Sequence, residues 1–101
     1  MVNNTPVALI TGGSGGLGRE LSLRFAKEGY SVAVHYRSNK KQAEETVRAI
    51  EEAGGKAAAV CADIGRAEDV DRLCDEVTQR FGVLDTFVDS AGNTGAAVLP
   101  R

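Results

Sequence analysis

Five glycines stand within seven residues near the start of this sequence, at positions 12, 13, 15, 16 and 18. They fit three spacings of phosphate-binding turns: G-x-G-x-x-G through Gly13, Gly15 and Gly18, G-x-x-G-x-x-G through Gly12, Gly15 and Gly18, and G-x-x-x-G-x-G through Gly12, Gly16 and Gly18. Glycine permits positive φ and a close approach of the backbone to a phosphate. The segment therefore predicts a phosphate-binding turn, and the spacing alone does not choose among the three registers.

A flexible loop without a ligand is the alternative interpretation of these glycines. The apolar run PVALIT ends directly before them and a helical pattern follows, which favours a turn from a strand into a helix. Ser14 can add a hydroxyl donor to the phosphate. A Walker A loop is excluded, because the sequence has no Gly-Lys followed by Ser or Thr.

The end of the second apolar run, VHYRSN at residues 34–39, indicates which nucleotide is bound. NAD sites of this type usually place an acid there, about 20 residues after the glycines, to bind the ribose hydroxyls. Here Tyr36 and Arg37 occupy that place, with Lys40 and Lys41 following. Arginine can pair with a 2′-phosphate bidentately, so NADP is favoured over NAD. The alternative is that these cations form only a solvated helix start.

Two further polar residues lie near the predicted site. His35, the only histidine, falls inside the second apolar run, and we interpret it as structural rather than catalytic. Asp63 follows the third apolar run, where its carboxylate can face an adenine ring. An Asx-type turn that ends the strand is the alternative for Asp63, and the two roles are compatible.

Composition limits the class of protein. The chain of 101 residues is 43% hydrophobic and 26% charged, which predicts one globular domain. Its net charge of −2 argues against nucleic-acid and basic membrane-binding surfaces. The sequence has neither a membrane-spanning apolar run nor a signal peptide at its start, so we expect a cytoplasmic protein. The spacing of Cys61 and Cys74 fits neither a redox pair nor a metal site, and predicts reduced, buried thiols.

Strand-like and helix-like segments alternate along the chain. Apolar runs at residues 6–11, 30–36, 56–64 and 83–92 predict buried parallel strands. The segments between them carry apolar residues at helical spacing: Leu17, Leu21 and Phe25, then Ala43, Val47, Ile50 and Gly54, then Val70, Leu73, Cys74, Val77 and Phe81. Right-handed crossovers then predict an α/β fold with a doubly wound parallel sheet in the strand order 3-2-1-4. The first two helices would cover one face and the third helix the other.

The ends of the helices also have signals in the sequence. Glycine follows each helix, at Gly29, at Gly54 with Gly55, and at Gly82, as is typical of a left-handed C′ position. Ser38 or Asn39 can cap the second helix. In such a sheet, ligands bind at the carboxyl ends of the strands beside the topological switch. The glycines and the stretch DSAG at residues 89–92 should therefore meet there.

Together these stretches resemble the classical branch of the short-chain dehydrogenase/reductase family, which includes 3-oxoacyl-acyl-carrier-protein reductases. TGGSGGLG at residues 11–18 matches the classical fingerprint T-G-x-x-x-G-x-G through Gly12, Gly16 and Gly18, and also matches the extended-branch pattern through Gly15. DSAG keeps Ala91 and Gly92 of the classical N-N-A-G and replaces both asparagines. The resemblance covers residues 1–101 as the first part of an NAD(P)-binding Rossmann domain.

The resemblance implies the residues of the site and an oxidoreductase activity. Cofactor contacts are implied at Gly12, Ser14, Gly16, Leu17, Gly18, Tyr36, Arg37, Ser38, Asp63, Ile64, Ser90, Ala91 and Gly92. The family's catalytic Ser and Tyr-x-x-x-Lys follow the fourth strand, so no catalytic residue is carried over. Tyr36 and Lys40 have that spacing but lie at the adenosine end. We expect the NADP(H)-binding part of a reductase or dehydrogenase, with a non-catalytic nucleotide-binding or interaction module as the alternative.

Stopping after four strands has a structural consequence in this interpretation. The fourth strand would be an open edge, and part of the face beside the third helix would be bare. We therefore expect the chain to self-associate through that edge or that face.

Overall fold

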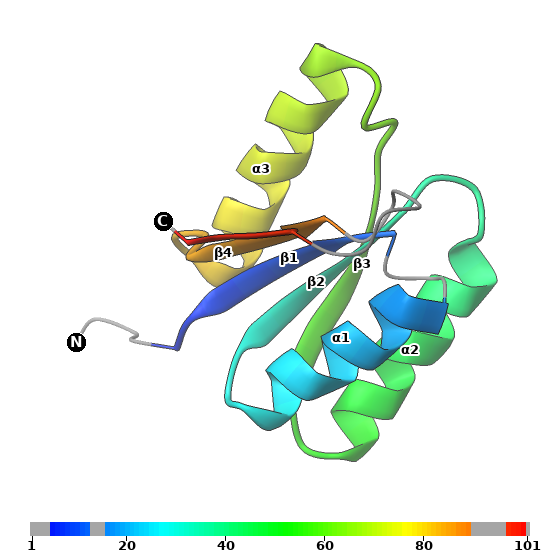
Figure 1. Cartoon of the computed structure of the whole chain (residues 1–101), viewed down its shortest axis with the longest axis vertical. Helices are drawn as coiled ribbons and strands as arrows, with labels where there is room; N and C mark the ends of the chain where they lie inside the picture. Colours follow the sequence, from blue (N-terminus) through cyan, green and yellow to red (C-terminus); the bar gives the residue numbers. More distant parts are fainter. Residues whose placement is uncertain (1–4, 13–15, 90–96, 101) are drawn as a thin grey trace.

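The structure, a computed structural model, describes residues 5–12, 16–89 and 97–100. Strands and helices alternate in the expected order up to the fourth strand, and one further strand follows (Figure 1). The elements are β1 (Val7–Thr11), α1 (Gly16–Lys27), β2 (Ser31–Tyr36), α2 (Lys40–Glu52), β3 (Lys56–Cys61), α3 (Ala67–Phe81), β4 (Thr86–Asp89) and β5 (Ala97–Pro100).

All five strands belong to one sheet in the order β3-β2-β1-β4-β5. β1 pairs parallel with β2 on one side and with β4 on the other, and β2 pairs parallel with β3. The predicted α/β fold with the strand order 3-2-1-4 is confirmed. Because the chain builds outward from β1 in two directions, the topological switch lies between β1 and β4.

The edge of the sheet beyond β4 differs from the prediction. β5 pairs with β4 antiparallel, from Thr86 opposite Pro100 to Asp89 opposite Ala97. A strand edge presents unpaired N–H and C=O groups, and a chain that reverses direction can satisfy them with its own backbone. The expectation of an open β4 edge is therefore wrong. Self-association through the sheet face beside α3 stays a prediction.

One face of the sheet is covered by α1 and α2, which lie side by side in Figure 1. Ala8 and Ile10 of β1 are fully buried on this face, in a cluster with Ala43 and Ile50 of α2. Ala43 and Ile50 are seven residues apart, two helical turns, so both side chains point to the same side of α2. The helix was predicted from this same spacing of apolar residues in the sequence.

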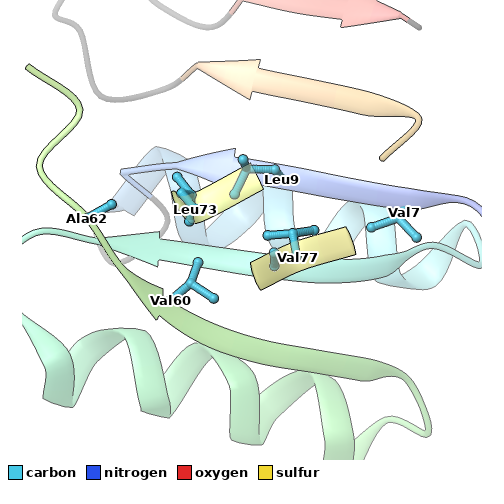
Figure 2. Close-up of a cluster of buried hydrophobic side chains, with 7 residues drawn as sticks. Val7, Leu9, Val60, Ala62, Leu73 and Val77 are labelled. Carbon is cyan, nitrogen blue, oxygen red and sulfur yellow. The ribbon is translucent and has the colours of Figure 1, made fainter. Parts of the chain in front are cut away.

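The opposite face is covered, among the described elements, by α3 alone (Figure 1). Val7 and Leu9 alternate with the residues of the first face and pack with Leu73 and Val77 of α3 (Figure 2). Phe87 of β4 packs against this cluster and stays partly buried. The prediction that the third helix stands on the other side of the sheet is confirmed.

The helices begin and end where backbone chemistry requires. Gly29, Gly54 and Gly82 have φ of 98°, 92° and 101°, in the left-handed region that glycine adopts without strain. Asn39 caps α2, because its side-chain oxygen accepts the backbone N–H of Gln42 at 3.2 Å. No helix in the described ranges combines the length and apolar character that crossing a bilayer requires.

Candidate functional site

The carboxyl ends of β1 and β4 meet at the topological switch. Thr11, the last residue of β1, is the register partner of Asp89, the last residue of β4. The Thr11 hydroxyl donates to the Asp89 carboxylate at 2.9 Å and lies 3.3 Å from the Val88 carbonyl oxygen. The stretches TGGSGGLG and DSAG were predicted to meet. The structure shows this contact for Thr11 and Asp89, the first residue of each stretch. Ser14, Ser90, Ala91 and Gly92 lie outside the described residues.

The described glycines of the turn have separate structural roles. Gly12 follows β1 with φ of 66°, a conformation that most side chains would resist. Gly16 is the first residue of α1, and Gly18 is buried against the protein one half-turn later. Leu17 lies between them and is 48% exposed. The classical register through Gly12, Gly16 and Gly18 thus joins the end of the central strand to the start of a helix.

His35 is buried beneath this turn, with 3% of its surface exposed. Its Nδ1 accepts the backbone N–H of Gly12 at 3.1 Å, and its Nε2 lies 2.7 Å from the carbonyl oxygen of Ala62. The sequence identified His35 as structural, and these contacts with two backbone segments agree with a structural role. What the sequence did not reveal is that the segments joined by His35 are the two that border the predicted site.

Arg37 and Asp63 lie next to each other at the predicted adenosine end. The Arg37 guanidinium is 4.0 Å from the Asp63 carboxylate, and the two side chains are 77% and 37% exposed. The other Asp63 oxygen accepts the N–H of Gly65 at 3.0 Å, so the Asx-type turn is confirmed. Ser38 is exposed and Ile64 is half-buried beside them.

Asp69, in the first turn of α3, is hydrogen-bonded to the backbone of the Asp63 turn. Its carboxylate accepts the backbone N–H of Asp63 at 2.9 Å and pairs with Arg72 at 3.5 Å. In the sequence alone, Asp69 is an acid in the first turn of the third predicted helix, where a negative charge is favourable. Its separation of six residues from Asp63 carries no periodic signal, and for that reason its second role could not be found from the pattern.

Lowering the pH should destabilise the protein at this turn, because it protonates the Asp69 carboxylate. The hydrogen bond from the Asp63 backbone lowers the pKa of the Asp69 carboxyl; burial partly opposes this, and Arg72 adds to the lowering. A carboxyl whose pKa is lower in the folded state stabilises the protein above its unfolded pKa of about 3.9, and this stability is lost as the pH falls through the folded pKa. Asp69→Asn should therefore lose less stability than the unmodified protein between about pH 7 and pH 3, measured by urea unfolding.

Asp71→Asn is the matched control for this measurement, because Asp71 is exposed on the same helix. We expect it to keep the acid sensitivity of the unmodified protein. An Asp69→Asn variant with unchanged acid sensitivity would show that the bond to Asp63 does not contribute to stability.

Tyr36 and Lys40 have the spacing of a catalytic pair but not its chemistry. Burial, and after it the neighbouring Cys61 thiol, raise the pKa of the Tyr36 phenol. A tyrosine that exchanges a proton with substrate near neutral pH needs the opposite shift. Lys40 Nζ lies 4.0 Å from the Glu44 carboxylate on its own helix. These observations support the prediction that the pair is not catalytic.

Both cysteines are free thiols, but their burial differs from the prediction. Cys61 is exposed and Cys74 is half-buried. Cys61 is the last residue of the edge strand β3, where no further strand of the described sheet covers it. Its thiol lies 3.6 Å from the Arg37 carbonyl oxygen. Burial, aided by two neighbouring acids, raises the pKa of the Cys74 thiol.

The family described as short chain dehydrogenase matches residues 6–100 of this sequence. The protein therefore belongs to the short-chain dehydrogenase/reductase family, whose members are oxidoreductases that bind nicotinamide dinucleotides. The parallel sheet in the order 3-2-1-4 with its alternating helices matches the fold of that family's solved structures.

Individual relatives agree with this assignment. 3beta-hydroxysteroid dehydrogenase 1 of Eggerthella lenta is 51% identical over 84 residues, which is 83% of this chain and 32% of that protein. The 3-oxoacyl-[acyl-carrier-protein] reductase of Staphylococcus aureus is 41% identical over 97 residues, which is 96% of this chain and 39% of that protein. A solved dehydrogenase/reductase from Sinorhizobium meliloti superposes with a TM-score of 0.84 at 40% identity, over 86% of this chain and 34% of its own. The chain thus spans about a third of the length of these relatives.

Proposed function

We propose that this chain is the NADP(H)-binding part of an oxidoreductase that transfers hydride between nicotinamide and a carbonyl or hydroxyl carbon. The observation that carries the proposal is Arg37. Its exposed guanidinium follows β2 at the place where an NAD site would present a carboxylate. A cation there attracts a 2′-phosphate, whereas an acid would repel it.

The phosphate end of the site fits a dinucleotide. α1 has no acidic residue in its first turn, so no carboxylate in that turn opposes an anion at the helix N-terminus. A Cβ added at Gly16 would meet no described atom within 4 Å, which leaves the start of α1 open to a ligand. The unpaired amides of a helix start donate to phosphate oxygens. When bound, NADP(H) supplies the hydride, and the residues of this chain bind and orient its adenosine half.

The contact between Arg37 and Asp63 is weak enough to yield to a phosphate. Both side chains are exposed and 4.0 Å apart, and such surface pairs contribute about 0–1 kcal/mol. Charge-assisted hydrogen bonds from arginine to a phosphate contribute about 1.5–3 kcal/mol. Arg37 would therefore turn toward the 2′-phosphate, and the carboxylate of Asp63 would stay available to the adenine.

We assign no catalytic residue within this sequence. Both tyrosines lie away from the switch between β1 and β4, since Tyr30 precedes β2 and Tyr36 ends it. The names of two relatives refer to a 3beta-hydroxysteroid and to a 3-oxoacyl-[acyl-carrier-protein], and the substrate of this protein is left open. A non-catalytic nucleotide-binding module is the less favoured alternative, because the family is one of oxidoreductases. The cytoplasmic location stays a prediction.

Titration with NADPH and NADH tests the proposal directly. We expect NADPH to bind roughly 10- to 100-fold more tightly, the range that corresponds to a charged hydrogen bond of about 1.5–3 kcal/mol. Arg37→Ala should remove most of this difference by weakening NADPH and leaving NADH nearly unchanged. Isothermal titration calorimetry can measure both affinities. The protein has no tryptophan, so quenching of its tyrosine fluorescence by the cofactor is the optical alternative.

Arg48→Ala is the matched control, because it removes the same side chain from an exposed position in the middle of α2. It should keep the preference for NADPH. Equal affinities for NADPH and NADH in the unmodified protein would overturn the role of Arg37.

A further inference from the structure

His35 joins three neighbouring strands at their carboxyl ends. It belongs to β2, and its two ring nitrogens contact Gly12 after β1 and Ala62 after β3. Gly12 opens the glycine segment, and Ala62 directly precedes Asp63. One buried side chain is thus bonded to both backbone segments that border the proposed dinucleotide site.

The backbone partners determine the protonation of the ring. The Gly12 N–H can only donate, so Nδ1 of His35 must be an unprotonated acceptor at 3.1 Å. The Ala62 carbonyl can only accept, so Nε2 must carry a hydrogen and donate across 2.7 Å. The imidazole is therefore neutral, with its proton on Nε2, and both of its nitrogens are satisfied.

These bonds change what Gly12 can do in the site. Its amide donates inward to His35, so it is not available to a phosphate. The contribution of Gly12 is instead its φ of 66°, which sets the direction in which the chain leaves β1 toward α1. The bond to His35 holds the Gly12 peptide in that orientation.

We propose that His35 is a positioning residue of the dinucleotide site: by accepting the Gly12 N–H it holds the start of the phosphate-binding turn in its orientation, while its bond to Ala62 anchors the ring. This inference rests on the proposed function. A side chain that only filled the core would need neither hydrogen bond. Each hydrogen bond, in contrast, forms only when its backbone group has a particular orientation.

A matched pair of substitutions separates the two bonds. In His35→Asn, the side-chain oxygen lies near the former Nδ1 and can still accept the Gly12 N–H, while the bond to Ala62 is lost. In His35→Gln, the longer amide can reach Ala62 as Nε2 does, and Gly12 loses its acceptor. Each variant loses one buried hydrogen bond, so we expect similar decreases in the thermal midpoint.

Affinity for NADPH should nevertheless separate the two variants. We expect His35→Gln to bind NADPH about tenfold more weakly, the effect of one displaced hydrogen bond, and His35→Asn to stay within about threefold of the unmodified protein. The amide resonances of Gly16 and Gly18 should respond to NADPH in His35→Asn at concentrations where they do not respond in His35→Gln. In the unmodified protein without cofactor, a 15N–15N coupling across the hydrogen bond should link the Gly12 amide to Nδ1.

The outcomes distinguish this inference from the proposed function. If the unmodified protein does not bind NADPH, the proposed function fails, whatever the coupling shows. If it binds NADPH and both variants bind equally well or equally poorly, the positioning role of His35 is overturned and the proposed function stands. Absence of the coupling between Gly12 and His35 would also overturn the positioning role.

Discussion

Replacing Leu9 by alanine will lower the free energy of unfolding by about 2–5 kcal/mol. Leu9 is fully buried at the middle of β1, between β2 and β4 in the sheet. Its side chain packs with Leu73 and Val77 of α3 (Figure 2). Alanine removes the transfer free energy of the lost carbons and leaves a cavity between the sheet and the helix. Domains of this size have only about 5–15 kcal/mol of stability, so the variant should unfold at a much lower urea concentration.

Val83→Ala is the control for the Leu9 variant. Val83 is 58% exposed, so its truncation should change the unfolding free energy by no more than about 0.5 kcal/mol. Circular dichroism during urea unfolding measures both variants. Similar losses in the two variants would contradict the assignment of β1 to the centre of the core.

Replacing Gly55 by valine is the second substitution with a large expected effect. A Cβ at this position would lie 2.8 Å from Cγ2 of Ile50 and 3.3 Å from the Ile50 carbonyl oxygen. Ile50 is fully buried against the sheet, so its methyl group has little room to move away. Overpacking of this kind costs about 1–3 kcal/mol, and the two additional methyls of valine should bring the loss to about 3 kcal/mol or more.

Two comparisons test this explanation of the Gly55 effect. Lys56→Val introduces the same side chain one residue later, at an exposed position, and should change stability by about 0.5 kcal/mol or less. Ile50→Leu removes the β-branch that carries Cγ2, so the smaller change Gly55→Ala should destabilise this background less than the unmodified protein. Additive effects of Ile50→Leu and Gly55→Ala would show that the contact with Cγ2 is not the cause.

The two substitutions also test how the site is supported. β1 carries Thr11 and Gly12 at its carboxyl end, and β3 leads to Asp63. Leu9 anchors β1 from the α3 side, whereas Gly55 allows α2 to approach the start of β3. In the proposed function, both strands must keep their places so that the start of the glycine segment and the Asp63 turn can face one dinucleotide.

Much of the site could be predicted from the sequence because its signals are local. The glycines beside an apolar run predicted a turn after β1, and Arg37 was selected as a candidate cofactor contact by its place at the end of the next run. Asn39 was one of two predicted caps for α2. It is the cap seen in the structure, where its side-chain oxygen accepts the N–H of Gln42. The glycines and Asn39 act on backbone within a few positions of themselves, and Arg37 is located by the short apolar run that it follows.

Other parts of the site depend on residues that lie far apart in the chain. The bonds of His35 join residues that are 23 and 27 positions from it, and Thr11 contacts Asp89 across 78 positions. No periodicity relates such residues. The exposure of Cys61 likewise depends on β3 being at the edge of the sheet, which is a property of strand order and not of the apolar run that contains it.

The sequence by itself determined the order of strands and helices, the parallel sheet 3-2-1-4 and the glycine turn at its switch. Apolar periodicity and glycine at positive φ act locally, and the strand order follows from the handedness that parallel crossovers share in general. Only the tertiary structure decided that β5 closes the edge beside β4, that Asp69 holds the Asp63 turn and that His35 is bonded beneath the glycines. Those contacts form between groups whose proximity is created by the folded sheet, because hydrogen bonds depend on distance in space and leave no regular spacing in the chain.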